Sequence, residues 1–445
     1  MIFSRFSLQL FGLLGFIILV DSFGEDTASF GTWVLYLMVG AFIEVGRNGL
    51  IQNGLIKFLS SASEEENPRI QTAATAINIG LTAIIGTALY FSSDWLANLV
   101  NAPELASILP IYCLTTVALI PFTQANCTQQ ANLSFKGTFW SSFIRQGSFF
   151  GYILYTWWSD GSFTLINLAW AQMITSALGS LVTVVAGWNF FHFSTRIDTA
   201  KVRQLLQFGI YSFGASLSTM LYKTIDRIML GILLGAGGTT AVALMDPAIR
   251  ITNVMEMPLY AMAAVLYPQS ARKAESEGPE AVRALYEKAV GATLAVVLPI
   301  CLVVLIFPSF FIRILTAGNE AYAESVPVLT VTILYTLFIP FARQFGTVLD
   351  SLGKPNWNFA FVISAAVLNI ATNYFYIAVM DMGVIGAAYG TLTTIAIKFV
   401  AEQIVLNRFL GVKPYRPLVY AWSFAKQGLA LGIKVLSNPR AALSR

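Results

Sequence analysis

Apolar residues in this chain are gathered into long runs that are separated by short polar segments. Runs of about 20 residues are what a helix needs to cross the hydrocarbon core of a bilayer. Hydropathy predicts twelve spanning helices, at approximately residues 6–22, 32–58, 71–92, 106–130, 139–158, 164–190, 207–234, 241–267, 289–311, 326–349, 357–380 and 386–410. The connections are too short to fold as domains, so we expect an all-α polytopic membrane protein.

Composition supports this class and excludes several others. The 445 residues are 56% hydrophobic and 11% charged, with a mean hydropathy of +0.68, whereas soluble domains carry about 25% charged residues. The three cysteines lie in apolar runs at unrelated spacings, and the chain has one histidine. This pattern argues against a disulfide framework and a metal site, and we expect no cofactor.

The basic residues predict the orientation of the helices. With the N-terminus inside, the cytoplasmic side collects 20 of the 27 basic residues: thirteen between Arg5 and Lys354, Arg145 among them, and seven from Arg408 onward. The opposite side receives Arg313 alone, and its loops are acidic. The positive-inside rule therefore places both termini in the cytoplasm.

Two short sequence matches indicate an internal repeat. LQLFG at 8–12 is echoed by LLQFG at 205–209, and IPFTQANCTQQANLSFKGTFW at 120–140 is echoed by IPFARQFGTVLDSLGKPNW at 339–357. Each half holds six predicted helices, an even number, so the two copies have the same orientation in the membrane. Parallel repeats of this kind usually form a transporter with its site between the halves.

The repeat predicts three parts of the chain. Residues 1–200 form an N-terminal six-helix bundle, residues 201–411 a C-terminal six-helix bundle, and residues 412–445 a tail. In the tail, Lys426 and Lys434 share one helical face with serine and glutamine residues. We expect an interfacial helix on the cytoplasmic leaflet, where anionic headgroups attract lysine.

Charged side chains inside the predicted spans are the candidate functional residues. Each costs about 2.5–3.5 kcal/mol near the bilayer centre on insertion scales, so such groups persist mainly where they face a polar interior. In the seventh span, Ser212, Ser216, Thr219, Lys223 and Asp226 form one stripe beside Arg227. The candidates for binding an anionic substrate are Arg47, Asn48, Gln52, Lys223, Arg227, Arg250 and Arg343. The candidates for coupling to an ion are Glu44, Asp226 and Asp246.

Local pairing is the alternative explanation for these charges. Opposite charges stand three or four residues apart in Glu44–Arg47, Lys223–Asp226, Asp246–Arg250 and Lys398–Glu402, a spacing that brings side chains together on a helix. Even with every such pair formed, the interior retains excess positive charge. It should therefore attract an anion.

Three long segments carry a resemblance to a known family. They are FGEDTASFGTWVLYLMVGAFIEVGRNGLIQNGLIKFLS, APELASILPIYCLTTVALIPF and LLQFGIYSFGASLSTMLYKTIDRIMLGILLGAGGTTAVALMDPAIRI. With the two-by-six repeat, they resemble the polysaccharide (Wzx-like, O-antigen) flippases of the multidrug/oligosaccharidyl-lipid/polysaccharide (MOP) exporter superfamily. The resemblance extends from about residue 5 to residue 410. It implies a MATE-like pair of six-helix bundles around a central cavity, with Arg47, Lys223, Arg227 and Arg250 beside the cavity wall.

The resemblance also implies a function. Such flippases move undecaprenyl-pyrophosphate-linked oligosaccharides across the bacterial inner membrane for O-antigen, capsule or exopolysaccharide synthesis. We expect a monomeric transporter, not an enzyme, with a proton or sodium ion as coupling ion and a polysaccharide polymerase and chain-length regulator as partners. Two alternatives remain open: a cation-coupled multidrug antiporter of the same superfamily, and a polymerase or ligase. The short acidic outer loops disfavour the enzyme, and the excess of buried cations disfavours the antiporter.

Overall fold

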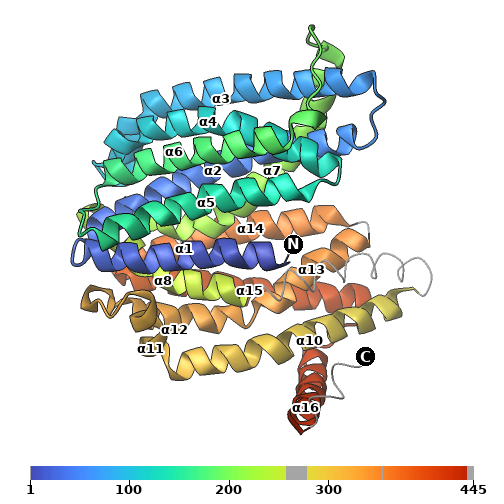
Figure 1. Cartoon of the computed structure of the whole chain (residues 1–445). Helices are drawn as coiled ribbons and strands as arrows, with labels where there is room; N and C mark the ends of the chain where they lie inside the picture. Colours follow the sequence, from blue (N-terminus) through green and yellow to red (C-terminus); the bar gives the residue numbers. More distant parts are fainter. Residues whose placement is uncertain (1, 257–277, 353, 438–445) are drawn as a thin grey trace. The chain divides into compact units, whose positions relative to one another are not determined.

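The computed structural model describes residues 2–256, 278–352 and 354–437. Within these ranges the chain is helical, and no strand occurs (Figure 1). It forms two compact units, unit 1 (Met1–Leu244 with Arg313–Tyr322) and unit 2 (Met245–Ile312 with Ala323–Arg445). The two units are described separately below.

The described residues of unit 1 contain seven long helices, the start of an eighth and, in Arg313–Tyr322, the end of the short helix α11 (Pro308–Leu315). The long helices are α1 (Ile2–Phe23), α2 (Thr27–Leu59), α3 (Glu66–Leu99), α4 (Leu105–Ala131), α5 (Phe135–Trp158), α6 (Leu165–Ala186) and α7 (Thr199–Leu233), followed by the first residues of α8 (Gly238–Met255). Side chains define several helix starts: Asp26 accepts a hydrogen bond from the Ser29 N–H, and Thr164 accepts one from the Asn167 N–H. Such caps satisfy amides that a helix leaves unpaired at its N-terminus.

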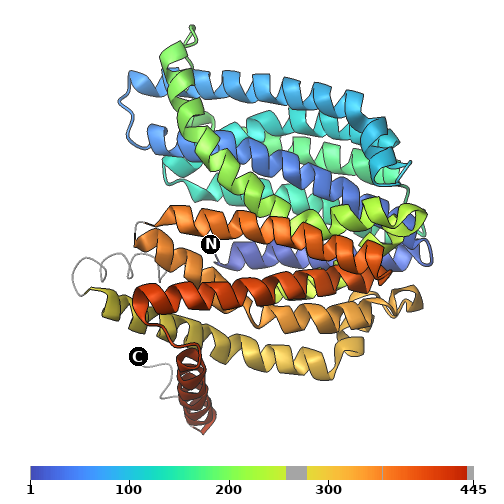
Figure 2. The ribbon, with the colours of Figure 1, turned by 180° about the vertical axis from the view of Figure 1, so that it is seen from behind.

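The helix α7 packs along α2 and also contacts α3 (Figure 2). Glycines permit a close approach, because a Cβ added at Gly209 would collide with the Leu50 carbonyl, and one at Gly49 would meet Phe213 and Ser216. Small residues of this kind bring helix backbones together in membranes. Although α7 opens the second half of the predicted repeat, its packing partners α2 and α3 belong to the predicted first half.

The described residues of unit 2 contain the rest of α8, α10 (Pro279–Ile306), the start of α11 (Pro308–Leu315), α12 (Ser325–Thr336), α13 (Ile339–Ser351), α14 (Pro355–Tyr374), α15 (Gly383–Leu410) and α16 (Arg416–Ser437). A π-helical segment, η4 (Phe375–Val379), continues α14. Part of the eighth predicted span, 241–267, lies outside the described residues.

The tenth span, predicted as one helix over 326–349, is two helices. The helix α12 ends at Thr336, and α13 begins at Ile339 with Pro340 in its first turn. Proline has no N–H to donate and its ring obstructs the preceding turn, so it favours a helix start, although α4, α8 and α10 each continue through an internal proline. The predicted span is therefore present as the apolar segment Ser325–Asp350, but two helices share it.

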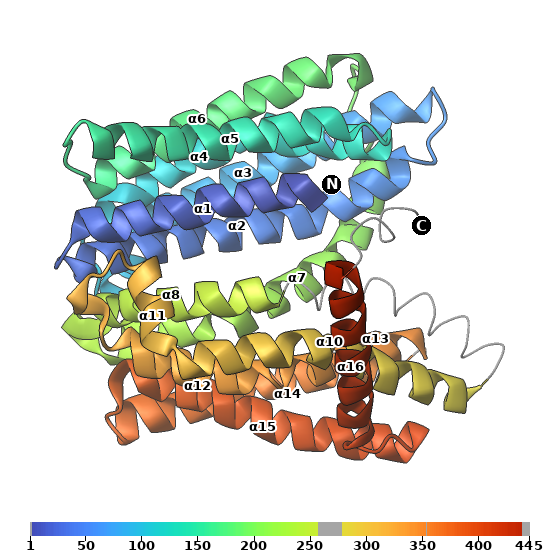
Figure 3. The ribbon, with the colours of Figure 1, turned by 60° about the horizontal axis from the view of Figure 1, so that its bottom comes forward.

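The helix α16 runs crosswise to the long helices of unit 2 (Figure 3). It packs on α10, where a Cβ added at Gly291 would collide with Tyr420, and Arg416 lies 3.6 Å from the buried Glu287 of α10. The Glu287 carboxylate raises the pKa of the Arg416 guanidinium. Tyr415, Leu418, Val419 and Trp422 stay exposed. This crosswise course is what the predicted interfacial helix requires.

Eight of the described helical segments are long and apolar enough to cross a membrane, with α12 and α13 counted together and α14 counted with η4. The expectation of a multi-pass, all-α membrane protein is thus met. The helices α1, α5, α7 and α8 coincide with predicted spans but are not among these eight. The total of twelve spans therefore stays a prediction.

Candidate functional site

A charged cluster lies inside unit 1, where α2, α4 and α5 meet. The Arg145 guanidinium lies 2.7 Å from the Glu44 carboxylate, an ion pair between α5 and α2. From α4, the Tyr112 hydroxyl lies 3.3 Å from the same carboxylate and 3.0 Å from the Gly40 carbonyl oxygen. The Arg145 and Glu44 side chains are 19% and 27% exposed, so the pair remains within reach of water or a ligand.

Arg47 belongs to the same cluster, but its guanidinium is hydrogen-bonded to α4 and not to Glu44. It is 2% exposed, and its guanidinium donates a hydrogen bond of 3.0 Å to the Thr116 carbonyl oxygen of α4. Its Nε has no hydrogen-bond partner. Glu44 therefore pairs with Arg145 and not with its sequence neighbour Arg47, so the predicted local pair was wrong. The cluster holds two guanidinium groups and one carboxylate.

Two further candidates of α2, Asn48 and Gln52, follow Glu44 at successive intervals of four residues. All three side chains are partly exposed, as expected for one helical face. The next residue on the chain, Asn53, donates a hydrogen bond of 2.6 Å to Ser212 of α7. Asn48 and Gln52 thus stand on the accessible face that carries Glu44.

The polar stripe predicted for α7 divides into two parts. Ser212 and Ser216 face α2, where they bond to Asn53 and pack on Gly49. Further along, Lys223 is exposed, Asp226 is 8% exposed and Arg227 is partly exposed. The first part of the stripe is therefore a helix–helix contact, and the second part carries the charges.

The other candidates lie in unit 2. Arg250 and Asp246 form an ion pair of 2.6 Å within α8, which confirms the local pairing predicted from their spacing. Lys398 and Glu402 likewise pair within α15 at 3.5 Å. Arg343 is partly exposed on α13.

Sequence reasoning missed Arg145, which it placed at the cytoplasmic ends of the helices. The structure places it ten residues into α5, about 15 Å along the helix axis. Its partner Glu44 is 101 residues away in sequence, so no spacing rule could pair them. The available signal was an arginine inside a predicted span that also carries Ser141 and Ser148 at helical spacing.

Comparisons with known proteins identify the family of this chain. A family model described as polysaccharide biosynthesis protein matches residues 9–274, and the MatE model matches residues 212–375. The probable low-salt glycan biosynthesis flippase Agl15 of Haloferax volcanii is 22% identical over 290 residues, which are 63% of this chain and 59% of that protein. The lipopolysaccharide biosynthesis protein WzxC of Escherichia coli K12 is 21% identical over 395 residues, 87% of this chain and 75% of that one.

Solved structures show the same fold. The lipid II flippase MurJ, in an inward closed conformation, has a TM-score of 0.75 at 13% identity and covers 98% of this chain and 92% of its own. A multidrug resistance MATE family transporter of the MOP superfamily, in its inward-facing conformation, has a TM-score of 0.74 at 15% identity, covering 90% and 95%. The chain therefore has the fold of these MOP-superfamily membrane proteins, and it belongs to the polysaccharide biosynthesis protein family, in agreement with its resemblance to the polysaccharide flippases.

Proposed function

We propose that this protein is a flippase for lipid-linked oligosaccharides, which it moves from the cytoplasmic to the outer leaflet of the bacterial inner membrane. The observation that carries the proposal is the charge of the cluster in unit 1. Two guanidinium groups, of Arg47 and Arg145, accompany the single carboxylate of Glu44. An excess of cations among membrane helices suits a polyanionic headgroup such as undecaprenyl pyrophosphate.

Within this cluster, Arg145 and Arg47 have different roles in the proposal. Arg145 is partly exposed and can donate to a pyrophosphate oxygen, whereas Arg47 is buried and contributes its charge through the protein. An incoming anion competes with Glu44 for Arg145. The released Glu44 carboxylate then takes up a proton or sodium ion, which couples substrate binding to an ion.

The rest of the proposed mechanism follows from the repeat. Twelve helices form two six-helix bundles around a central cavity, and rocking of one bundle against the other alternates access. Lys223, Arg227, Arg250 and Arg343 are further candidates for anion binding, and Asp226 and Asp246 are further candidates for ion coupling. Polar side chains such as Asn48 and Gln52 hold the glycan, and the isoprenoid chain stays in lipid. Both termini lie in the cytoplasm, and the monomer works with a polymerase and a chain-length regulator.

Native mass spectrometry of the purified protein with its co-extracted lipids tests this proposal. We expect an isoprenoid pyrophosphate, free or glycosylated, on the wild type and its loss from the double variant Arg227→Gln/Arg250→Gln. The matched control is Arg196→Gln, which removes an exposed loop cation and should keep the lipid.

The outcomes separate the proposal from the antiporter alternative. Wild-type protein that carries no isoprenoid lipid but binds a cationic dye would replace the flippase by a multidrug antiporter. Retention of the lipid by the double variant would show that these two cations do not hold the headgroup.

A further inference from the structure

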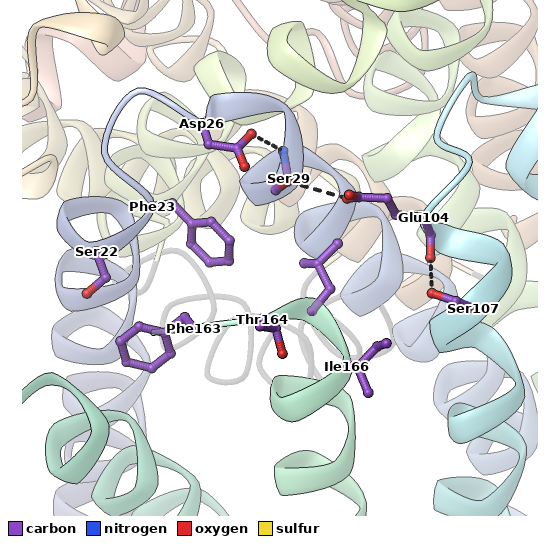
Figure 4. Close-up of a pocket in the computed structure, with 10 residues that line it drawn as sticks. Ser22, Phe23, Asp26, Ser29, Glu104, Ser107, Phe163, Thr164 and Ile166 are labelled. Carbon is purple, nitrogen blue, oxygen red and sulfur yellow. Dashed lines mark hydrogen bonds between the residues drawn. The ribbon is translucent and has the colours of Figure 1, made fainter. Parts of the chain in front are cut away.

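A pocket of about 410 Å³ opens in unit 1 at the end of the helices that the charge bias assigns to the outside (Figure 4). The last turn of α1 and the first turns of α2, α4 and α6 line it. Figure 4 shows Asp26, Ser29 and Glu104 along one edge and Phe163 with Thr164 along the opposite edge. The volume falls in the range of small-molecule sites, about 300–1,000 Å³.

Three of the four hydroxyl groups that line this pocket donate their protons to the protein, whereas that of Thr164 accepts from the Asn167 N–H. Ser22 donates to the Ile18 carbonyl at 2.7 Å, Ser107 donates to the Glu104 carbonyl at 2.7 Å, and Ser29 lies 3.3 Å from the Glu104 carboxylate. With their protons engaged, these three oxygens offer only lone pairs to a ligand.

The two carboxylates of the pocket add more acceptors. Asp26 uses one oxygen to accept from the Ser29 N–H at 3.0 Å, and a carboxylate has about four acceptor sites in all. Glu104 makes no side-chain cap of its own helix, α4, and reaches across to Ser29 of α2. No basic residue lines the pocket. The site is therefore rich in acceptors and suits a ligand that donates hydrogen bonds.

Helix ends moderate the charge of the pocket. The N-termini of α2, α4 and α6 and the C-terminus of α1 meet here, and each end carries roughly half an elementary charge. Their sum is positive and offsets part of the two carboxylates. The remaining negative potential disfavours phosphate. Because solvent and salt screen charges at an exposed site, this potential is also too weak to select a ligand by its positive charge.

Two aromatic rings complete the lining, since Phe23 and Phe163 are both partly buried at the pocket. A flat apolar ring beside clustered acceptors matches the two chemistries of a sugar, whose C–H face is apolar and whose rim carries donating hydroxyls. We propose that this pocket binds a neutral sugar ring. This proposal rests on the proposed function, because the natural ligand would be a sugar of the transported glycan once that glycan has reached the outer side of the membrane.

The test is a titration of the full-length protein in nanodiscs with galactose and N-acetylglucosamine. Saturation-transfer NMR measures the binding. We expect weak binding of at least one sugar by the wild type. Glu104→Gln and Phe163→Ala should each weaken it about tenfold, the loss expected for one strong contact. The control Asp94→Asn removes an exposed carboxylate at the end of α3 outside the pocket and should bind as the wild type does.

Tetramethylammonium and inorganic pyrophosphate serve as competing probes. Binding of tetramethylammonium in place of both sugars, sugar binding unchanged in both pocket variants, or no sugar binding at all would overturn the sugar pocket. Equal thermal unfolding of all variants shows that they fold.

The sugar pocket and the proposed function fail in different ways. A wild type that binds sugar here but carries no isoprenoid lipid would overturn the flippase and leave the pocket standing. A wild type that restores glycan export in a flippase-null strain but binds no sugar would overturn the sugar pocket and leave the flippase proposal standing.

Discussion

Replacing Arg145 with alanine should abolish complementation of a flippase-null strain and destabilise the protein. The change removes the guanidinium that lies 2.7 Å from Glu44 and leaves that carboxylate inside the membrane helices without its partner. Loss of one member of a buried pair costs about 3–5 kcal/mol. Because these side chains are 19% and 27% exposed, solvent screening lowers the expected cost to about 2 kcal/mol. Glycan export and thermal unfolding in detergent measure the two effects.

Two further variants separate the structural from the functional effect. Lys136→Ala removes an exposed cation from the same helix, α5, and should leave both export and stability unchanged. The double variant Glu44→Gln/Arg145→Gln removes both charges and should recover stability but not export. Full export by Arg145→Ala, at normal membrane levels, would exclude this residue from the transport mechanism.

Replacing Gly209 with alanine should prevent α7 from packing on α2. A Cβ at this position would collide with the Leu50 carbonyl oxygen, and a helix backbone cannot move aside as a flexible side chain can. Overpacking of this kind costs about 3 kcal/mol. We expect a sharp fall in folded protein, measured by membrane yield, size-exclusion profile and melting temperature.

Gly214 provides a matched control on the same helix. A Cβ there would meet nothing within 4 Å, and alanine is favoured over glycine inside a helix by about 0.5–1 kcal/mol. Gly214→Ala should therefore fold at least as well as the wild type. Equal yield and melting temperature for Gly209→Ala and Gly214→Ala would show that the contact between α2 and α7 is not tight in the membrane.

The helices could be predicted well because membrane crossing demands long apolar runs, which hydropathy detects directly. Every predicted span coincides with a described helix, in part for the eighth. The exception is the short break between α12 and α13 within the tenth span, because a hydropathy average does not register an interruption of the helical backbone. The crosswise course of α16 fits its amphipathic composition.

The candidate site was predictable only where interactions are local. Asp246–Arg250 and Lys398–Glu402 are confirmed pairs, because four residues on a helix place two side chains together. The pair Glu44–Arg145 joins two helices, and its formation depends on how α2 and α5 pack. The roles of the candidate residues in transport, and the division of the chain at residue 200, stay predictions.

The contact between α2 and α7 has a consequence for biosynthesis. Asn53 and Ser212, which bond across it, are 159 residues apart. At about 5–20 residues per second, a ribosome needs on the order of ten seconds or more to make the intervening chain. The face of α2 that carries Gly49 and Asn53 stays without its α7 partner during that time, while the first six helices already stand in the bilayer. Residues 1–200 therefore cannot bury this face of α2 by themselves during synthesis, and α7 covers it only after it emerges from the translocon.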